Sequence, residues 1–172
     1  VYKRQDMWRA KLGVVSLQVP KAGQPMVDTL RTAVAHMLIS RVGPSLQPGT
    51  RSYARSWIRD GAMISEGLLR MGRSDAVRDY LNWYAPFQFE NGKVPCCVDA
   101  RGSDPVPEND SHGELIYNIA EYGRYTGDST FMELMWPHVQ GAYQYMEQLR
   151  ASERTEENRA RNPAFYLSLI HI

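Results

Sequence analysis

The side chains best suited to chemistry lie in one stretch, residues 51–60, just before an apolar segment with helical spacing. Arg59 presents a planar fork of hydrogen-bond donors, and the adjoining Asp60 carboxylate only accepts hydrogen bonds. Tyr53 and Trp57 add flat apolar faces that each carry a polar group. Sugars have hydroxyls that need donors and acceptors, and they have C–H faces that lie against rings. The stretch therefore indicates a site for a polar, ring-shaped molecule.

A second acidic pair, Asp110 and Glu114, stands at the start of another segment with helical spacing. Residues four apart lie on one face of a helix, so these carboxylates can share a hydrogen-bond network. Plainer roles stay open beside the functional ones. Asp60 and Asp110 are both favoured N-cap residues, and Arg59 can simply form an ion pair at the surface.

Metal and cofactor binding are not expected from the sequence. Cys96 and Cys97 are adjacent, which suits neither a loop-closing disulfide nor a recognised zinc spacing, so we expect two ordinary thiols. His36, His112 and His138 show no metal-ligand spacing with one another and are expected to be structural.

Composition argues against two other classes of partner. The chain has 172 residues, of which 43% are hydrophobic, so it is long enough to bury a core. Its 20 basic and 19 acidic residues give no charge excess that would favour nucleic acid. No apolar run approaches the ~20 residues that span a bilayer, so we expect no membrane partner.

The two ends of the chain carry little structural information. Residues 1–7 and 164–172 are expected to be artefactual or disordered, and the domain is expected to span residues 8–163. The chain begins at Val1, so a leader could precede it. Cytoplasmic and secreted locations therefore both stay open.

Hydrophobic periodicity predicts helices over approximately residues 25–39, 60–71, 75–85, 111–125 and 129–149. The segment 60–71 has almost no polar face, which predicts a helix that is buried on most sides. Pro137 predicts a kink in the last helix or a later start. Asn91 and Gly92 predict the turn of a small β-hairpin within the long loop 86–110. Residues 102–107 are expected to form loop.

Loop lengths predict where the site lies. The loops before the helices at 60–71 and 111–125 contain about 15 to 25 residues, whereas the connections after them are tight turns. Antiparallel neighbouring helices place alternate connections at opposite ends. Both long loops should therefore lie at one end, with an inner and an outer layer of helices. The predicted fold class is an all-α array of helical hairpins.

The spacing of Tyr53, Trp57, Arg59 and Asp60 resembles the first substrate-binding signature of the glucoamylase-like six-hairpin (α/α)6 glycosidases. That family places a tyrosine seven residues, a tryptophan three residues and an arginine one residue before the aspartate. Residues 109–114 resemble bacterial relatives, including glycogen-debranching-type glucosidases. The resemblance implies a fragment of an (α/α)6 toroid, with about two hairpins and a preceding helix.

The same resemblance implies part of a glycoside hydrolase that acts by inverting acid/base hydrolysis on a terminal sugar of an α-glucan-like oligo- or polysaccharide. Arg59 and Asp60 would hold hydroxyls of the non-reducing-end sugar. The general acid and base would lie beyond Ile172, so we expect the piece to be inactive alone. Two alternatives stay open: another carbohydrate-active (α/α)6 enzyme, such as a phosphorylase, lyase or epimerase, and a non-catalytic helical-repeat binding module.

Overall fold

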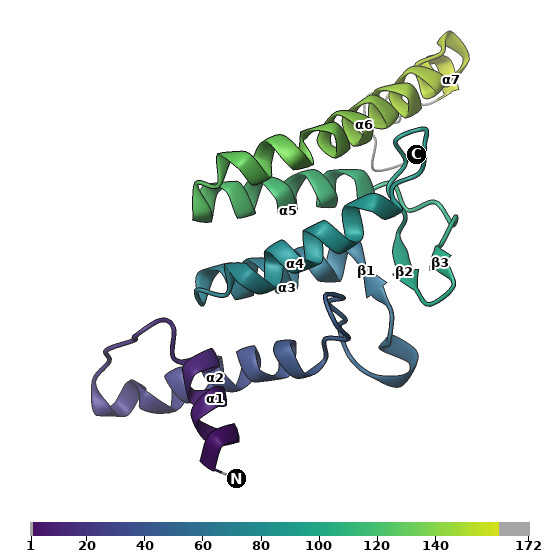
Figure 1. Cartoon of the computed structure of the whole chain (residues 1–172). Coiled ribbons are helices and arrows are strands. Elements are labelled where there is room, and N and C mark those ends of the chain that lie inside the picture. The colour runs from purple at the N-terminus through teal and green to yellow at the C-terminus, as the bar shows by residue number, and fades with distance from the viewer. Residues whose placement is uncertain (1, 162–172) are drawn as a thin grey trace.

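The computed structural model describes residues 2–161, which are mostly helical (Figure 1). The helices are α1 Tyr2–Leu12, α2 Gln24–Ile39, α3 Ile58–Arg70, α4 Ser74–Tyr84, α5 Ser111–Thr126, α6 Ser129–Glu153 and α7 Glu156–Arg161. Three short strands complete the fold: β1 Ser56–Trp57, β2 Cys97–Asp99 and β3 Gly102–Ser103. The predicted class, all-α with a small β-hairpin, is confirmed.

Residues 126–129 end one helix and start the next, as the sequence predicts. Gly127 adopts the left-handed conformation with φ 65°, which ends α5. The Asp128 carboxylate then accepts a hydrogen bond of 3.0 Å from the Phe131 N–H, which caps α6. Because α6 begins at Ser129 and continues through Pro137, the alternative of a later start is wrong.

The position and burial of α3 differ from the prediction. The helix begins at Ile58 with Trp57 at its N-cap, so Asp60 lies in the first turn and is not the cap. Only one side is buried, since Met63 is 68% exposed. Apolar residues occur on both sides of this helix, and hydrophobicity alone does not reveal which side meets a neighbour.

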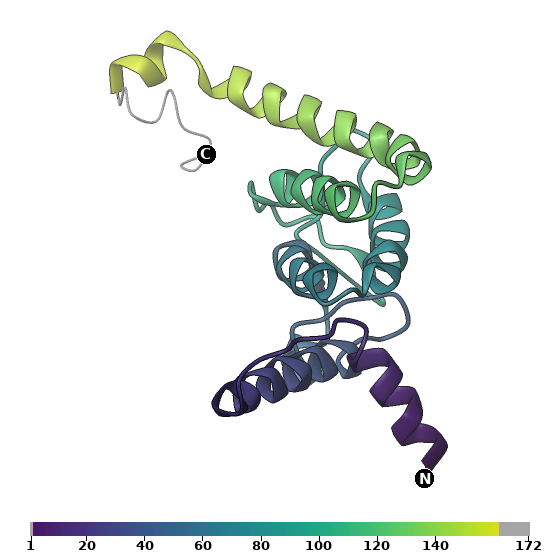
Figure 2. The ribbon, with the colours of Figure 1, turned by 90° about the vertical axis from the view of Figure 1, so that its left-hand side faces the viewer.

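The helices stack as antiparallel hairpins. In Figures 1 and 2 the stack continues from α2 through the pair α3 and α4 to the pair α5 and α6. Helix α5 packs against both α3 and α6, and α4 packs against both α3 and α5. The predicted apolar stripe of α4 is buried in full, and it consists of Ala76, Val77, Tyr80, Leu81 and Tyr84.

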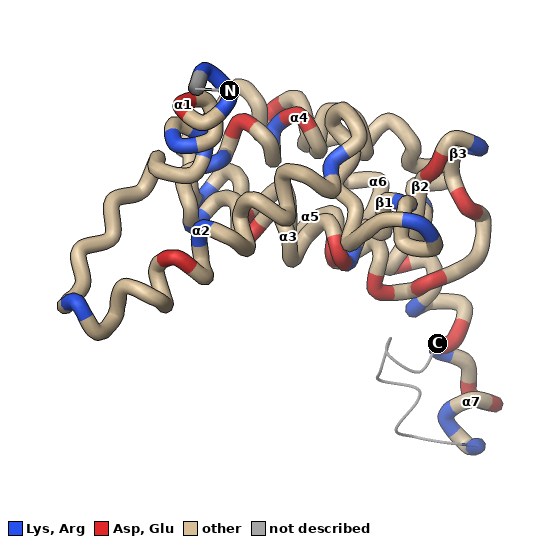
Figure 3. Tube along the Cα trace, turned by 90° about the horizontal axis from the view of Figure 1, so that it is seen from below, with Lys and Arg blue, Asp and Glu red and all other residues tan. Residues whose placement is uncertain are grey.

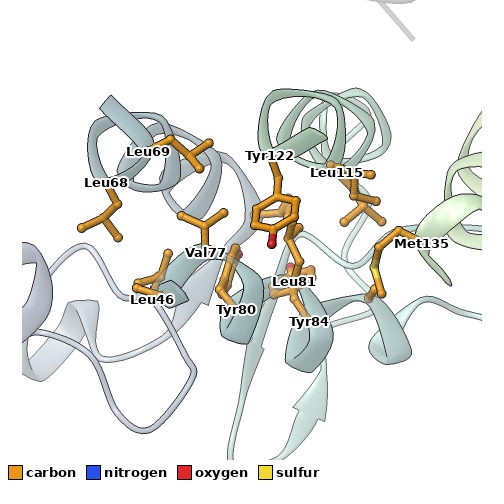
Figure 4. Packing of buried hydrophobic residues seen from close by; sticks show 14 of the residues in the cluster. Leu46, Leu68, Leu69, Val77, Tyr80, Leu81, Tyr84, Leu115, Tyr122 and Met135 are labelled. Atoms are coloured by element: carbon orange, nitrogen blue, oxygen red, sulfur yellow. The ribbon is translucent and has the colours of Figure 1, made fainter. Parts of the chain in front are cut away.

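These α4 side chains form the centre of the hydrophobic core, together with Leu68, Leu115 and Met135 from the neighbouring helices (Figure 4). Burying a side chain of this size stabilises the fold by roughly 1.5–3 kcal/mol. The Tyr84 hydroxyl, which would be costly to bury unpaired, donates to the Pro95 carbonyl at 2.9 Å. This bond fastens the second long loop to the core.

The three strands join the two long loops, which confirms that both loops lie at one end of the stack. Ser56 pairs with Val98 and Trp57 with Cys97 in the antiparallel ladder of β1 and β2. Strand β3 pairs with the other edge of β2. The starts of α3 and α5, which follow these loops, are therefore brought to the same end.

The predicted hairpin exists within residues 86–110, but its turn was placed wrongly. The strands β2 and β3 turn at residues 100–101, and Gly102 follows with φ 97°, a conformation that glycine adopts without strain. The Asp99 carboxylate supports the turn by accepting from the Arg101 N–H at 2.8 Å. Asn91 and Gly92 form a separate turn without flanking strands, and residues 102–103, expected as loop, form β3.

The expectations for the two ends have different outcomes. Helix α1 begins at Tyr2, inside the segment 1–7 that we expected to be artefactual or disordered. The expectation for 164–172 concerns residues outside those described. Across the described helices, none is long and apolar enough to cross a membrane.

Two glycine substitutions test the packing of α3 against α4. Gly61→Ala should destabilise the fold by about 1–3 kcal/mol, because the added methyl group would overlap the buried Tyr80 ring and hydroxyl. The matched control is Gly113→Ala in α5, where the methyl group meets open space and should stabilise by up to about 1 kcal/mol. Urea unfolding measures the stability of both variants. Equal changes in the free energy of unfolding would contradict this packing.

Candidate functional site

Arg59 forms the central contact between the two long loops. From the first turn of α3 its Nε donates to Asp110 Oδ2 at 2.6 Å, and its Nη2 donates to Glu108 Oε2 at 2.8 Å. The side-by-side packing of α3 and α5 makes this contact possible, because both helices start at the end that carries the strands. Two of the predicted site residues, Arg59 and Asp110, are thus brought together.

Asp110 occupies the N-cap position of α5, but its carboxylate makes no capping hydrogen bond. The hydrogen bond from Arg59 holds the pKa of Asp110 below its ordinary value, and burial opposes this effect. In the same way, the bond to Asp110 raises the pKa of Arg59. The interpretation of Asp110 as a side-chain cap is therefore wrong: the side chain is used to pair with Arg59.

Glu114 lies one turn further along α5 and is shifted in the opposite direction. Burial raises the pKa of Glu114, the negative charge of Asp110 adds to the rise, and Arg59 opposes it. Two carboxylates whose pKa values move apart are suited to different protonation states at one pH. Asp110 and Glu114 thus offer one readily ionised group and one that keeps its proton to higher pH.

Asp60 faces a pocket between α2 and α3, on a different side of α3 from the Arg59 pairs. The pocket has a volume of about 750 Å³. Within residues 2–161 no hydrogen bond or ion pair engages the Asp60 carboxylate, which leaves it free to accept from a ligand. Other polar lining residues are Thr29, Thr32, His36, Ser40, Gln47 and Thr50.

The aromatic pair lies in the segment just before α3 and does not line this pocket. The Tyr53 and Trp57 ring centroids are 6.3 Å apart with an interplanar angle of 54°, and Tyr53 is 64% exposed. The Tyr53 side chain passes close to Gly49, which lines the Asp60 pocket. Arg51, just before Tyr53, has φ 56°, a left-handed conformation that is unusual for a residue with a side chain.

The structure thus separates the six predicted residues. Arg59, Asp110 and Glu114 lie between the starts of α3 and α5, whereas Asp60 lines the pocket beside α2. Tyr53 and Trp57 contact each other in the segment before α3 and do not line that pocket. The division follows from the helical geometry, since side chains one residue apart point about 100° apart.

Sequence reasoning missed Glu108 and the polar residues of α2. Glu108 accepts a hydrogen bond from Arg59. Its position two residues before Asp110, in an acidic loop, was the one feature of the sequence that could have indicated a role in the site. His36 and the threonines of α2 gave no such indication, because helical spacing does not say which helix they will face.

Arg55 forms a second ion-pair group beside the first. Its guanidinium contacts Asp99 at 2.9 Å and Asp104 at 2.7 Å, which fastens the first long loop to β2 and to the segment after β3. The guanidinium also lies 5.6 Å from the Trp57 ring centroid. Figure 3 shows acidic and basic residues interspersed around the strands at this end.

Comparison of this chain with protein-family models, curated proteins and solved structures finds no match. The interpretation of the site therefore depends on its geometry and on the residue spacing.

The Arg59 pair can be tested through the pH dependence of stability. Because the folded-state pKa of Asp110 is lowered, its pairing stabilises the protein above about pH 4 and is lost as the pH falls through that lowered pKa. Arg59→Met should raise the pKa of Asp110 towards about 3.9. The stability lost at pH 7 should stay below about 1 kcal/mol, because both side chains are roughly half exposed.

NMR titration of the Asp110 carboxyl carbon and urea unfolding at neutral and acidic pH measure these effects. Arg70→Met is the matched control, since Arg70 pairs with Glu66 further along α3 and should leave Asp110 unchanged. An identical Asp110 titration in the protein and in Arg59→Met would rule out the pairing.

Proposed function

We propose that this chain forms the sugar-holding part of a glycoside hydrolase that acts on a terminal sugar of an α-glucan-like oligo- or polysaccharide. The observation that carries the proposal is the arrangement at the start of α3. There two acids fix the Arg59 guanidinium, and the adjoining Asp60 carboxylate, which no described residue engages, opens into a pocket.

The pocket beside Asp60 has the size and chemistry that a sugar ring requires. Its volume of about 750 Å³ falls within the roughly 300–1,000 Å³ common for ligand sites. Asp60 can accept from sugar hydroxyls, and His36 can exchange hydrogen bonds with them. Met63 and Ile64 supply apolar surface for C–H groups, and the exposed Tyr53 side chain lies close to Gly49, one of the lining residues.

Arg59 is oriented for recognition by the bonds that it already makes. A guanidinium has five N–H donors, and the bonds to Asp110 and Glu108 use two of them. The remaining donors are held in a fixed plane, and Arg59 is about half exposed. In this proposal they bind a hydroxyl of the saccharide on the side of α3 that faces α5, next to the Asp60 pocket, and Glu114 takes part through the network of Asp110.

The proposal assigns binding roles, and the hydrolytic step needs further groups. Inverting hydrolysis uses two carboxylates about 6.5–9.5 Å apart, one of them protonated, with a water molecule opposite the leaving group. The six residues here are assigned to holding the substrate, so the general acid and base are other carboxylates of the enzyme.

Sugar titration tests the proposal directly. Glucose and maltose should each bind the 172-residue chain, as measured by calorimetry. Asp60→Ala should weaken binding by about 10- to 100-fold, because a charge-assisted hydrogen bond contributes roughly 1.5–3 kcal/mol. Asp79→Ala, which removes an exposed carboxylate from α4, is the control and should bind as the unmodified chain does.

The outcomes separate the alternatives. Equal affinity of the chain and of Asp60→Ala would remove Asp60 from the site. No binding of either sugar at any concentration tested would favour the non-catalytic helical-repeat module. In an enzyme that hydrolyses the sugar, Asp60→Ala should lower turnover by orders of magnitude without unfolding the protein.

A further inference from the structure

The side chains of the adjacent residues Cys96 and Cys97 converge on one point. In a regular strand successive side chains point to opposite faces, but Cys96 precedes β2, and the two Sγ atoms lie 3.3 Å apart. Both cysteines are buried, with 4% and 1% of their surface exposed. The local bend therefore creates a thiol pair that an extended strand would not.

Asp104 completes a group of three potential ligands. Its Oδ2 lies 3.8 Å from Cys97 Sγ, and one ligand atom from each of the three residues lies within 4.8 Å of the others. The backbone holds Asp104 in place, because its N–H donates to the Cys97 carbonyl at 3.0 Å. The arrangement thus belongs to the β2–β3 hairpin itself.

We propose that Cys96, Cys97 and Asp104 bind one zinc ion. Two Zn–S bonds of about 2.3 Å in tetrahedral geometry place the sulfurs about 3.8 Å apart, so the observed pair needs to open by only about 0.5 Å. A disulfide would require closure to about 2.0 Å between residues whose Cα atoms, about 3.8 Å apart, are closer than disulfides usually span. The geometry favours the metal.

The chemistry of the three ligands also selects this ion. Thiolates prefer soft or borderline metals, and zinc accepts a carboxylate oxygen beside them. Three protein ligands leave the fourth tetrahedral position to a water molecule. Burial raises the pKa of the Cys97 thiol to about 12, so the ion must displace the thiol proton when it binds.

The charges around Cys96, Cys97 and Asp104 sum to zero when a divalent ion is bound to two thiolates. Asp99 and Asp104 are offset by Arg55 and Arg101, so the surroundings are neutral. Two thiolates would leave two uncompensated negative charges, which a divalent cation neutralises.

Arg55 and the backbone also orient the carboxylate ligand. Asp104 Oδ2 accepts from Arg55 at 2.7 Å, and Oδ1 accepts from the Val106 N–H at 3.0 Å. Partners of this kind fix the direction of a metal ligand and increase its affinity for the ion. Because Arg55 comes from the first long loop, zinc on the β2–β3 hairpin would stiffen the junction of both loops. This inference does not depend on sugar binding.

The test uses the whole chain, reduced and stripped of metal. Titration with Zn²⁺ alone should show one ion per chain. Co²⁺ in place of Zn²⁺ should give the sulfur-to-metal charge-transfer absorption of a thiolate complex. Cys97→Ser and Asp104→Asn should each weaken Zn²⁺ binding at least tenfold, whereas the control Asp28→Asn on α2 should not.

The proposal would be overturned by a lack of stoichiometric binding, by a Zn²⁺ affinity that Cys97→Ser leaves unchanged, or by a Cys96–Cys97 disulfide that forms in place of the zinc complex. Because Cys97→Ser could fail to fold, the Co²⁺ spectrum of the unmodified chain provides an independent test of thiolate binding. Bound Co²⁺ without the sulfur band would also exclude the site.

Discussion

The pairing of β1 with β2 is the constraint on which the rest of this structure depends. It joins two loops that are distant in the sequence through the pairs of Ser56 with Val98 and Trp57 with Cys97. The ladder continues into the start of α3, where the Ile58 N–H donates to the Cys96 carbonyl at 3.0 Å. A slip of one residue would turn every side chain of β1 to the opposite face. The direction of Arg59 and the position of Arg55 both follow from this register.

The packing beneath the sheet explains why the register is held. The Tyr80 side chain is fully buried against Gly61, a position where any larger residue would collide with it, so α3 and α4 approach closely. Tyr84 and His112 then connect this core to the second long loop. Tyr84 donates to Pro95, and the His112 Nδ1 accepts from the Val94 N–H at 3.1 Å. Burial lowers the pKa of His112 to about 4, which keeps the ring neutral for that role.

Several features could be predicted because they depend on neighbours in the sequence. The α4 stripe, the Gly127 stop and the Asp128 cap all follow from local rules, and each is confirmed. The loop lengths correctly predicted that both long loops lie at one end. The one-sided burial of α3 could not be predicted, since Met63 is as apolar as its buried neighbours and only the absence of a packing partner leaves it exposed.

The sequence by itself determined the helical array, the positions of its long loops and the residue types available for a sugar site. The tertiary structure decided how those residues are used. It paired Asp110 with Arg59 instead of with a helix end, placed Asp60 in the lining of a pocket beside α2, and brought Asp104 to the two cysteines. The physical reason is that such contacts depend on the relative placement of α3, α5 and the strands. Packing and strand register determine that placement, and neither is encoded in the spacing of residues within one element.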